Sequence, residues 1–404
     1  MTPRNNFGNR AKAVDLAAAS WKEAEQAGIV DLTVQLLGDG RVAWADKKLM
    51  NVSSYDYLGL GLHPDILAGA IRGISAAGAL NSTISRPRMV TTLLRQAEEE
   101  LSDLWNVEAV TTTSCWNAAT ALLPMLACGA LNGGRRPHIA MDSRAHISLQ
   151  ALRAAAADET TVSTVPHNDL NAVESALMEH DVVCYVTEGY YSHGGAAPAA
   201  ELLALQAKYE GRLWIVADEA HSLSVTGVRG GGVFASAVAT RPNVYVLASL
   251  NKGFGASGGV ILLGPRGDEV TRNVLIRNGG PLFTSQRVNS AGLGAIRASV
   301  QLHGSAELTR RQRDLAANLA HFDSRINATG SGDRVPIRFV NLGTASQTVL
   351  ACERLLKQHA IYAQGLWFPI VPRDASGLRV FIRADMDFAQ IDTFADALAE
   401  VTRE

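Results

Sequence analysis

Short apolar runs recur through the middle of the chain, and each has the length of a buried β-strand. They occupy residues 109–113, 138–141, 182–187, 213–217, 244–248 and 259–263. Between them lie alanine- and leucine-rich stretches of helical length, at residues 117–130, 148–157 and 199–210. Apolar strands that alternate with helices predict a mainly parallel sheet covered on both faces. Ligands bind such sheets at the carboxyl ends of the strands, so polar residues that end a strand are the first candidates for chemistry.

The pattern changes from about residue 289 onward. A long helical stretch comes first, then strands at 337–340 and 377–382, then a C-terminal helix at 387–402. This order predicts a smaller α+β domain. We expect the first fifty residues to form a helical segment that packs onto the rest. The predicted organisation is therefore an N-terminal segment (1–50), a large domain (51–288) and a small domain (289–404).

Bulk properties exclude several classes of protein. The chain has 404 residues, of which 47% are hydrophobic and 19% charged, enough for a large core and more than one domain. A net charge of -2 gives no basic field that would bind nucleic acid or a membrane surface. We find no signal peptide and no apolar span of about 18 residues, so we expect a cytoplasmic protein. The four cysteines lack metal-ligand or CxxC spacing, so we expect neither a disulfide framework nor a metal site.

Three of the predicted strands run directly into polar residues. Residues 213–217 lead into Asp218-Glu-Ala-His221, residues 182–187 lead into Glu188, and residues 244–248 lead into Ser249-Leu-Asn-Lys252. Alone, a strand-terminal aspartate is more often a helix cap, and a lysine beside glycines is more often a surface residue. Found together on neighbouring strands, they favour one shared crevice with chemistry in it.

The residue types indicate pyridoxal 5′-phosphate (PLP). Lys252 is one of seven lysines and is followed by glycines and small residues that let a cofactor approach the backbone. A desolvated lysine has a lowered pKa, which frees its amine to form an imine with an aldehyde. PLP also needs a negative partner for its protonated pyridine nitrogen, and Asp218 at the end of a buried strand suits that role.

Two motifs resemble those of the α-oxoamine synthase family. Asp218-Glu-Ala-His-Ser-Leu, followed by Gly227 and Gly230-Gly-Gly, resembles the family's D-E-A-H-S-x-G-x-x-G-x-x-G, and Ser249-Leu-Asn-Lys-Gly-Phe-Gly-Ala-Ser-Gly-Gly resembles T-x-S-K-x-x-G-x-x-G-G. The resemblance extends from about residue 51 to the C-terminus. It implies an α/β protein of PLP fold type I, which is aspartate aminotransferase-like. Such a protein has a large domain with a mainly parallel seven-stranded sheet and a smaller α+β C-terminal domain.

The resemblance also implies roles for individual residues. Lys252 would hold the cofactor as a Schiff base, Asp218 would face the pyridine nitrogen, His221 would bond the phenolic oxygen, and His146 would stack on the ring. The other implied cofactor contacts are Glu188, Ser192, Ser249 and the turn Ser114, Cys115, Trp116, together with Thr284 and Ser285, which would reach the cofactor phosphate of a partner subunit. The resemblance therefore also implies that this protein forms a homodimer with shared active sites.

The substrate side departs from the family pattern. Arg379 matches the arginine that grips the carboxylate of the amino acid, but Tyr55 replaces an asparagine and Leu94 a histidine. The late A-H-T is Ala384-Asp385-Met386. Within the family, the chain looks most similar to synthases of α-hydroxyketone-type quorum-sensing autoinducers, through Trp116-Asn117-Ala118, the 82–95 loop and the 283–285 region.

These observations predict a PLP-dependent transferase that forms a carbon–carbon bond. An α-amino acid, S-adenosylmethionine among the candidates, would be condensed through a quinonoid intermediate with an acyl-CoA, an acyl carrier protein thioester or another electrophile. A second hypothesis begins with γ-elimination from S-adenosylmethionine, followed by addition to a non-thioester electrophile such as a pyridinium ring. A third, from another class, is a PLP-binding protein without catalysis. The amino acid, the electrophile and the pathway stay open.

Overall fold

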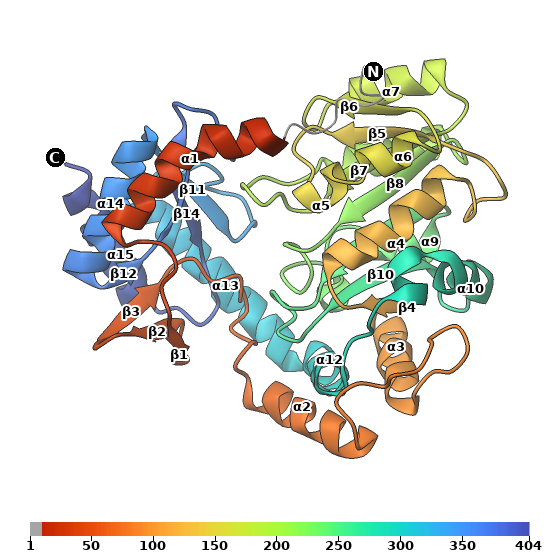
Figure 1. Ribbon diagram of the computed structural model, residues 1–404, viewed down its shortest axis with the longest axis horizontal. Coiled ribbons are helices and arrows are strands. Elements are labelled where there is room, and N and C mark those ends of the chain that lie inside the picture. The colour runs from red at the N-terminus through yellow and green to blue at the C-terminus, as the bar shows by residue number, and fades with distance from the viewer. Residues whose placement is uncertain (1–9, 404) are drawn as a thin grey trace. The chain divides into compact units, whose positions relative to one another are not determined.

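The computed structural model describes residues 10–403, and within them the chain forms two compact units (Figure 1). The first comprises Leu60–Ser192 and Ala196–Thr309, and the second comprises residues 10–59, His193–Gly195 and residues 310–403. Residues 10–59 therefore belong with the C-terminal residues, whereas the sequence pattern divided the chain at 50 and 288. Residues 1–9 of the predicted N-terminal segment lie outside the described part.

A seven-stranded sheet organises the first unit. Its order is β4 (Val107–Thr112), β10 (Gly259–Pro265), β9 (Val244–Ser249), β8 (Leu213–Asp218), β7 (Val183–Glu188), β5 (His138–Asp142) and β6 (Val162–Val165). All pairs from β9 to β6 are parallel, and β10 runs antiparallel to both of its neighbours. The predicted fold class is confirmed, and six of these strands were predicted. The seventh, β6, is a partly buried edge strand without an apolar run.

Helices cover both faces of this sheet, because successive side chains of its central strands point to opposite sides. On β8, Leu213, Ile215 and Ala217 join one core, while Trp214 and Val216 join the other. The first core contains α3 (Thr92–Trp105), α7 (Leu170–Glu179), α8 (Ala199–Lys208), α9 (Ala235–Thr240) and α12 (Ser290–His303). The second contains α4 (Cys115–Ala127), α10 (Glu269–Asn278) and α11 (Gly280–Thr284).

Two helical details of the first unit differ from or add to the sequence pattern. The helix predicted at 148–157 is two short helices, α5 (Ile147–Gln150) and α6 (Arg153–Ala157). The chain tightens between them, where the Leu152 N–H donates to the Leu149 carbonyl only three residues earlier. Helix α2 (Pro64–Ala77) packs closely on α12, since a Cβ on Gly69 would lie 2.7 Å from the carbonyl oxygen of Gly294.

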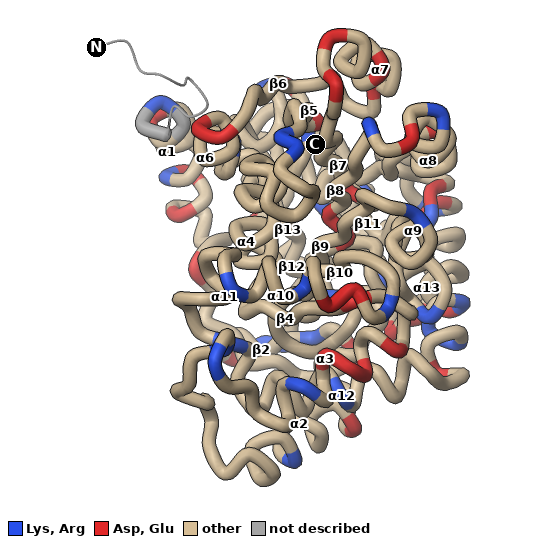
Figure 2. Tube along the Cα trace, turned by 90° about the vertical axis from the view of Figure 1, so that its right-hand side faces the viewer, with Lys and Arg blue, Asp and Glu red and all other residues tan. Residues whose placement is uncertain are grey.

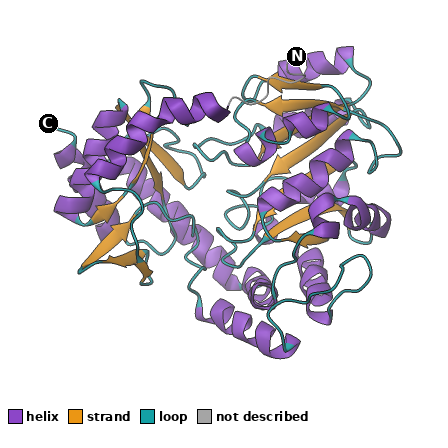
Figure 3. Cartoon of the chain, in the orientation of Figure 1, coloured by secondary structure: helices purple, strands orange, loops and turns teal. Residues whose placement is uncertain are grey.

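The second unit contains two small sheets and four helices among its described residues (Figure 3). One sheet has the order β1 (Gln35–Leu36), β2 (Arg41–Trp44), β3 (Lys47–Asn51) and β12 (Ile361–Tyr362), and the other has the order β11 (Ile337–Gly343), β14 (Ser376–Phe381) and β13 (Gln364–Leu366). The helices are α1 (Arg10–Ala27), α13 (Ala306–Arg325), α14 (Ala345–His359) and α15 (Phe388–Val401).

The prediction that the first fifty residues are helical was therefore correct only for α1. Strands β1 to β3 follow it, and the parallel pairing of β3 with β12 joins this segment to the C-terminal residues. The strands were missed because they are short, and the sequences Arg41–Trp44 and Lys47–Asn51 begin with charged side chains that are exposed.

Acidic and basic positions are interspersed along the trace, as they are on α13 (Figure 2). Between residues 10 and 403, no helix combines the length and the apolar character that a membrane crossing requires. All four cysteines are free thiols.

Candidate active site

The carboxyl ends of β7, β8 and β9 lie at one edge of the sheet because these three strands are neighbours and parallel. Glu188 and Asp218, the last residues of β7 and β8, stand opposite each other in the strand register. Ser249 ends β9, and its hydroxyl hydrogen-bonds the side chain of Asn251 in the following loop. Polar groups from three strands therefore share this edge.

Lys252 and His221 come together in the loops after β9 and β8. The lysine Nζ lies 3.0 Å from Nε2 of His221, which is within hydrogen-bond distance. The histidine is buried and the lysine is half-buried. An amine in this position is sheltered from bulk water and has a neighbour with which it can exchange a proton.

The carboxylate of Asp218 is buried and already accepts hydrogen bonds from the protein. The backbone N–H of Ala220 donates to Oδ1 over 2.8 Å. The Cys115 Sγ lies 3.7 Å from Oδ1 and 3.6 Å from Oδ2. Burial, followed by the negative charge of Asp218, raises the pKa of Cys115 well above its ordinary value. The sulfur is therefore a protonated thiol that donates to the carboxylate.

Glu188 is the second acidic group at this edge, and its side chain is 1% exposed. Burial first, and then the negative charge of Asp218, raise the pKa of Glu188 well above its ordinary value, while Lys252 acts in the opposite direction. Within the described residues its Oε1 has no hydrogen-bond partner. Burial and the neighbouring Asp218 therefore favour the protonated form of Glu188 more than water would.

Asp142 at the end of β5 organises the loop that leads to His146. It is fully buried and accepts hydrogen bonds from the hydroxyls of Tyr185 and Tyr191, over 2.9 and 3.0 Å, while Nδ1 of His167 lies 3.1 Å away. Burial opposes ionisation, but the bonds from His167 and from backbone N–H groups hold the pKa of Asp142 below its ordinary value. Sequence reasoning assigned no role to this aspartate, although it follows a predicted strand as Asp218 does.

His146 caps the short helix α5. Its Nδ1 accepts the backbone N–H of Ser148 over 3.2 Å and lies 2.9 Å from the hydroxyl of the same residue. The backbone of His146 also hydrogen-bonds to Glu188, so this loop contacts the end of β7. Ser192, a few residues beyond that end, is buried.

The turn after β4 begins the 13-residue helix α4. Ser114 is its N-cap, and the hydroxyl accepts the Asn117 N–H over 3.1 Å. The turn packs against β10 so tightly that a Cβ on Gly259 would lie 2.6 Å from the backbone nitrogen of Cys115. A helix N-terminus held this way presents backbone N–H groups that can receive a phosphate. Trp116, the next residue, is 42% exposed.

Glu219, the residue after β8, has a structural role. It is fully buried, and the backbone N–H groups of Val233 and Phe234 donate to its Oε1 over 2.9 and 2.7 Å. Burial raises the pKa of Glu219 to about 7 against those bonds. The glutamate therefore ties the end of β8 to the glycine-rich segment that follows.

Thr284 and Ser285 stand apart from the residues above. They end α11 and are exposed, and the Thr284 hydroxyl donates to the Gly280 carbonyl over 2.9 Å. Leu94, which matches a family histidine, is a buried core residue of α3. It cannot supply the polar contact that a histidine would.

The second unit holds the two predicted substrate residues, and they contact each other. Arg379 of β14 donates through Nη2 to the Tyr55 hydroxyl over 3.0 Å and to Gln364 Oε1 over 2.9 Å. Its guanidinium also lies 5.2 Å from the ring of Phe381. The Tyr55 ring is 37% exposed. Gln364 was missed because nothing in the sequence relates residue 364 to residue 379; the antiparallel register of β13 and β14 pairs them.

These residues fit PLP on structural grounds. A sheltered amine, a buried carboxylate, a histidine beside the amine and a capped helix N-terminus are all in the first unit, on loops that follow adjacent strands. In that order, these four groups suit the aldehyde, the pyridine nitrogen, the phenolic oxygen and the phosphate of PLP. Between residues 10 and 403, no group of three or more potential metal ligands is present.

Comparisons with known proteins agree with this chemistry. The family model for aminotransferase class I and II matches residues 47–398. An 8-amino-7-oxononanoate synthase from Mycolicibacterium paratuberculosis is 29% identical over 367 residues, covering 87% of this chain and 89% of the relative, and one from Mycobacterium bovis is 30% identical, covering 87% and 88%. A variant serine palmitoyltransferase from S. paucimobilis, solved with a bound PLP–myriocin aldimine, has a TM-score of 0.82 at 19% identity and covers 98% of this chain and 99% of that one.

Proposed function

The chain belongs to the α-oxoamine synthase family within the class I and II aminotransferases and uses PLP as its cofactor, and we propose that it joins an α-amino acid to an acyl thioester or another electrophile. The observation that carries the proposal is the placement of Lys252, His221 and Asp218 at one sheet edge. When bound, PLP supplies an aldehyde carbon that links to a primary amine and a pyridine ring that withdraws electrons from the bonds beside that amine.

Each of the three residues has a separate task. The Lys252 amine would hold the cofactor, and a substrate amine would compete with it for the cofactor aldehyde. The buried carboxylate of Asp218 keeps a proton on the pyridine nitrogen by charge pairing. Nε2 of His221 lies 3.0 Å from the lysine and would hydrogen-bond the phenolic oxygen of the cofactor.

Proton transfer at the substrate α-carbon falls to Lys252. Once released, its Nζ, which lies 3.0 Å from Nε2 of His221, would be able to take up a proton and return it. Burial and Asp218 raise the pKa of Glu188, which disfavours a second negative charge next to the lysine. His146 stacks on the cofactor ring in our proposal, with its orientation fixed by Ser148.

We further propose a homodimer with shared active sites. The turn Ser114-Cys115-Trp116 and Ser249 would bind the cofactor phosphate from within the chain, and the exposed Thr284 and Ser285 would reach the phosphate in the partner. One face of α2 supports an apolar interface. Its exposed side chains recur at helical spacing: Leu67, Ile71 and Ile74 are 47%, 67% and 41% exposed.

Arg379 and Tyr55 would receive the amino substrate as a carboxylate. A guanidinium fork binds a carboxylate through two parallel hydrogen bonds, and Tyr55 and Gln364, to which Arg379 donates, are neutral groups. Arg379→Ala should weaken amino-acid binding by about 2–5 kcal/mol. Arg379→Lys keeps the charge but loses the fork, and it should recover only part of that loss. Wild-type affinity in Arg379→Ala, measured by spectral titration, would remove Arg379 from the substrate site.

Lys252 provides the decisive test. Borohydride reduction of the holoenzyme followed by peptide mass spectrometry should place the cofactor on Lys252, and Lys252→Ala should lack the cofactor's visible absorption band at about 420 nm. An adduct on any other lysine contradicts the assignment. Release of free CoA in a panel of amino acids and acyl-CoA substrates would then establish the acyl-transfer reaction.

A second candidate reaction uses S-adenosylmethionine, and Tyr55 favours it. The partly exposed ring at this position offers an aromatic face to a sulfonium or another cation. This substrate would lose methylthioadenosine by γ-elimination before addition to a non-thioester electrophile such as a pyridinium ring. Release of methylthioadenosine without free CoA separates this reaction from acyl transfer. Absence of both products with all substrates would favour a PLP-binding protein without catalysis. The autoinducer-synthase branch and the cytoplasmic location stay predictions.

A further inference from the structure

Cys115 is the first residue of α4, and its sulfur is within hydrogen-bond distance of both oxygens of Asp218, at 3.6 and 3.7 Å. We propose that Cys115 is a positioning residue that tunes the cofactor: its thiol donates to Asp218 and thereby weakens the hold of that carboxylate on the pyridine proton. This inference rests on the proposed role of Asp218. It goes further by assigning a role to the thiol, which touches the carboxylate rather than the phosphate.

The backbone around Cys115 fixes the direction of its side chain. Ser114 caps the helix through Asn117, so the first turn of α4 cannot rotate freely. On the other side, the strand β10 approaches so closely that only a glycine fits at position 259. These two constraints set the Cα–Cβ direction of Cys115 without involving the thiol, and in the rotamer observed the sulfur lies within hydrogen-bond distance of Asp218.

The thiol keeps its proton in this environment. Burial and the charge of Asp218 raise the pKa of Cys115, Glu188 acts in the same direction, and Lys252 acts in the opposite direction. The net shift is upward, so at neutral pH the group is an S–H donor and not a thiolate. It adds no negative charge to the site.

Donors to a carboxylate stabilise its charged form and lower its basicity. Asp218 already accepts the Ala220 N–H, and the thiol adds a second protein donor. Both donors belong to the protein itself and not to the cofactor. The pyridine nitrogen then competes with two protein donors for one carboxylate, and its own pKa is lower than an unoccupied carboxylate would make it.

The test reads the protonation of the ring nitrogen directly. Holoenzyme is reconstituted with PLP labelled with ¹⁵N in the ring, and the ¹⁵N chemical shift is followed against pH in wild type, Cys115→Ala, Cys115→Ser and Cys128→Ala. Loss of the thiol should raise the pKa of the ring nitrogen by about one pH unit, since a hydrogen bond to a charged group has about that value. Cys128→Ala, a half-buried cysteine at the end of α4 that donates to Met125, should follow wild type.

Three outcomes of this titration bear on the proposal. A Cys115→Ala curve that overlays wild type overturns it, as does an equal shift in Cys128→Ala. A curve for Cys115→Ser that lies between wild type and Cys115→Ala supports it, because a hydroxyl can replace the donor while a purely structural role predicts no such rescue.

Infrared spectroscopy tests the contact without a change at Cys115. The S–H stretch of Cys115, identified by its loss in Cys115→Ala, should move to higher wavenumber in Asp218→Asn, because an amide is a weaker acceptor than a carboxylate. An unchanged stretch overturns the inference even if a cysteine variant fails to fold. The two proposals also fail separately. If Asp218→Asn leaves the ring nitrogen protonated as in wild type, the proposed role of Asp218 fails. If Asp218→Asn deprotonates it but Cys115→Ala has no effect, only the role of Cys115 fails.

Discussion

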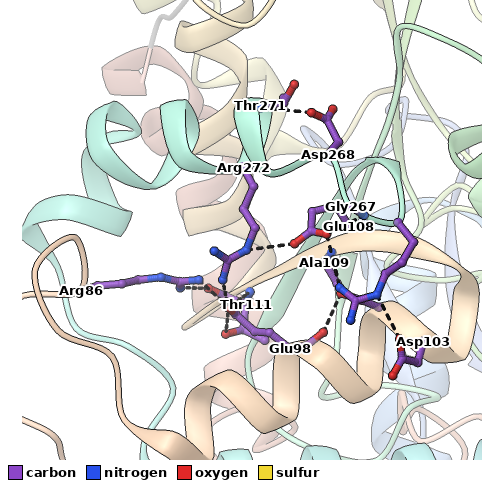
Figure 4. Close-up of polar contacts among 12 residues, drawn as sticks. Arg86, Glu98, Asp103, Glu108, Ala109, Thr111, Gly267, Asp268, Thr271 and Arg272 are labelled. Atoms are coloured by element: carbon purple, nitrogen blue, oxygen red, sulfur yellow. Dashed lines mark hydrogen bonds and ion pairs between the residues drawn. The ribbon is translucent and has the colours of Figure 1, made fainter.

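A buried ion network that joins α3, β4 and α10 should dominate the response of the first unit to a single change of charge. The network consists of Arg86, Glu98, Glu108 and Arg272 (Figure 4). Glu98 on α3 accepts Arg86 over 2.5 Å and Arg272 over 2.9 Å, and Arg272 Nε lies 3.0 Å from Glu108. Glu98 Oε1 also accepts the Thr111 N–H over 2.7 Å. The substitution Glu98→Gln removes the central charge and keeps the shape.

The magnitude follows from burial. The side chains of Arg86 and Glu98 are only 2% and 3% exposed, so water cannot replace the lost carboxylate. Removing one partner of a buried ion pair leaves an uncompensated charge and costs about 3–5 kcal/mol. An amide oxygen still accepts from Thr111, so we expect about 3 kcal/mol of lost unfolding free energy for Glu98→Gln. Glu99→Gln, on the adjacent exposed position of α3, should change it by less than about 0.5 kcal/mol.

The same residue makes stability depend on pH. Burial raises the pKa of Glu98, but Arg86, Arg272 and Thr111 outweigh it, and the pKa lies below the ordinary value of 4.5. A carboxylate with a depressed folded pKa contributes stability above its unfolded pKa, and this contribution is lost as pH falls through the folded value. The gap between wild type and Glu98→Gln should therefore be full at pH 7 and shrink below about pH 4.5. Denaturant unfolding at several pH values measures it. A constant gap, or equal loss in Glu99→Gln, refutes the reasoning.

Two further predictions concern the cofactor site. Gly259→Ala should weaken PLP binding about tenfold or more, roughly 1.4 kcal/mol, because the new Cβ would meet the Cys115 backbone nitrogen at 2.6 Å. In the control Gly264→Ala, on the same strand, the new Cβ meets only the side chain of Asp268 at 3.0 Å, so this variant should bind PLP normally. Equal affinities of the two variants in a fluorescence titration would contradict this prediction. Mixing Lys252→Ala chains with chains altered at Thr284 and Ser285 should restore activity in one of two shared sites, whereas a fully active monomer on a sizing column would exclude sharing.

The sheet could be predicted because its central strands are apolar on both faces and end in distinctive polar residues. The same physics explains the omissions. Strand β6 lies at an edge, where half of its side chains need not be apolar, and β2 and β3 owe their pairing to each other rather than to an apolar pattern. No glycine or proline marks the break between α5 and α6 in the sequence. Ala151 and Leu152, which lie at the break, also suit a continuous helix.

The candidate site, like the fold, could be predicted from the sequence only in part. The sequence motifs identify the residues around Lys252. The parallel pairing of β7 and β8 explains why Asp218 and Glu188 are neighbours. Contacts made across loops could not be read from the sequence. The thiol of Cys115 reaches Asp218 across 103 positions of the chain, and Gln364 reaches Arg379 only through the register of two strands. Such contacts depend on packing, which no local pattern encodes.

Glu98 and Glu188 show how differently a buried carboxyl can affect stability. The folded pKa of Glu188 is raised by burial and by Asp218, so between the ordinary value of 4.5 and the raised value the folded chain retains a proton that the unfolded chain releases. Stability must then fall as pH rises through that range, which is opposite in sign to the effect of Glu98. Glu188→Gln removes this loss, and its stability relative to wild type should increase from pH 5 to pH 8, by about 1.4 kcal/mol per pH unit at most. A relative stability that stays flat with pH would mean that Glu188 is ionised. Two negative carboxylates would then face the cofactor, and the proposal that Asp218 carries the single charge would fail.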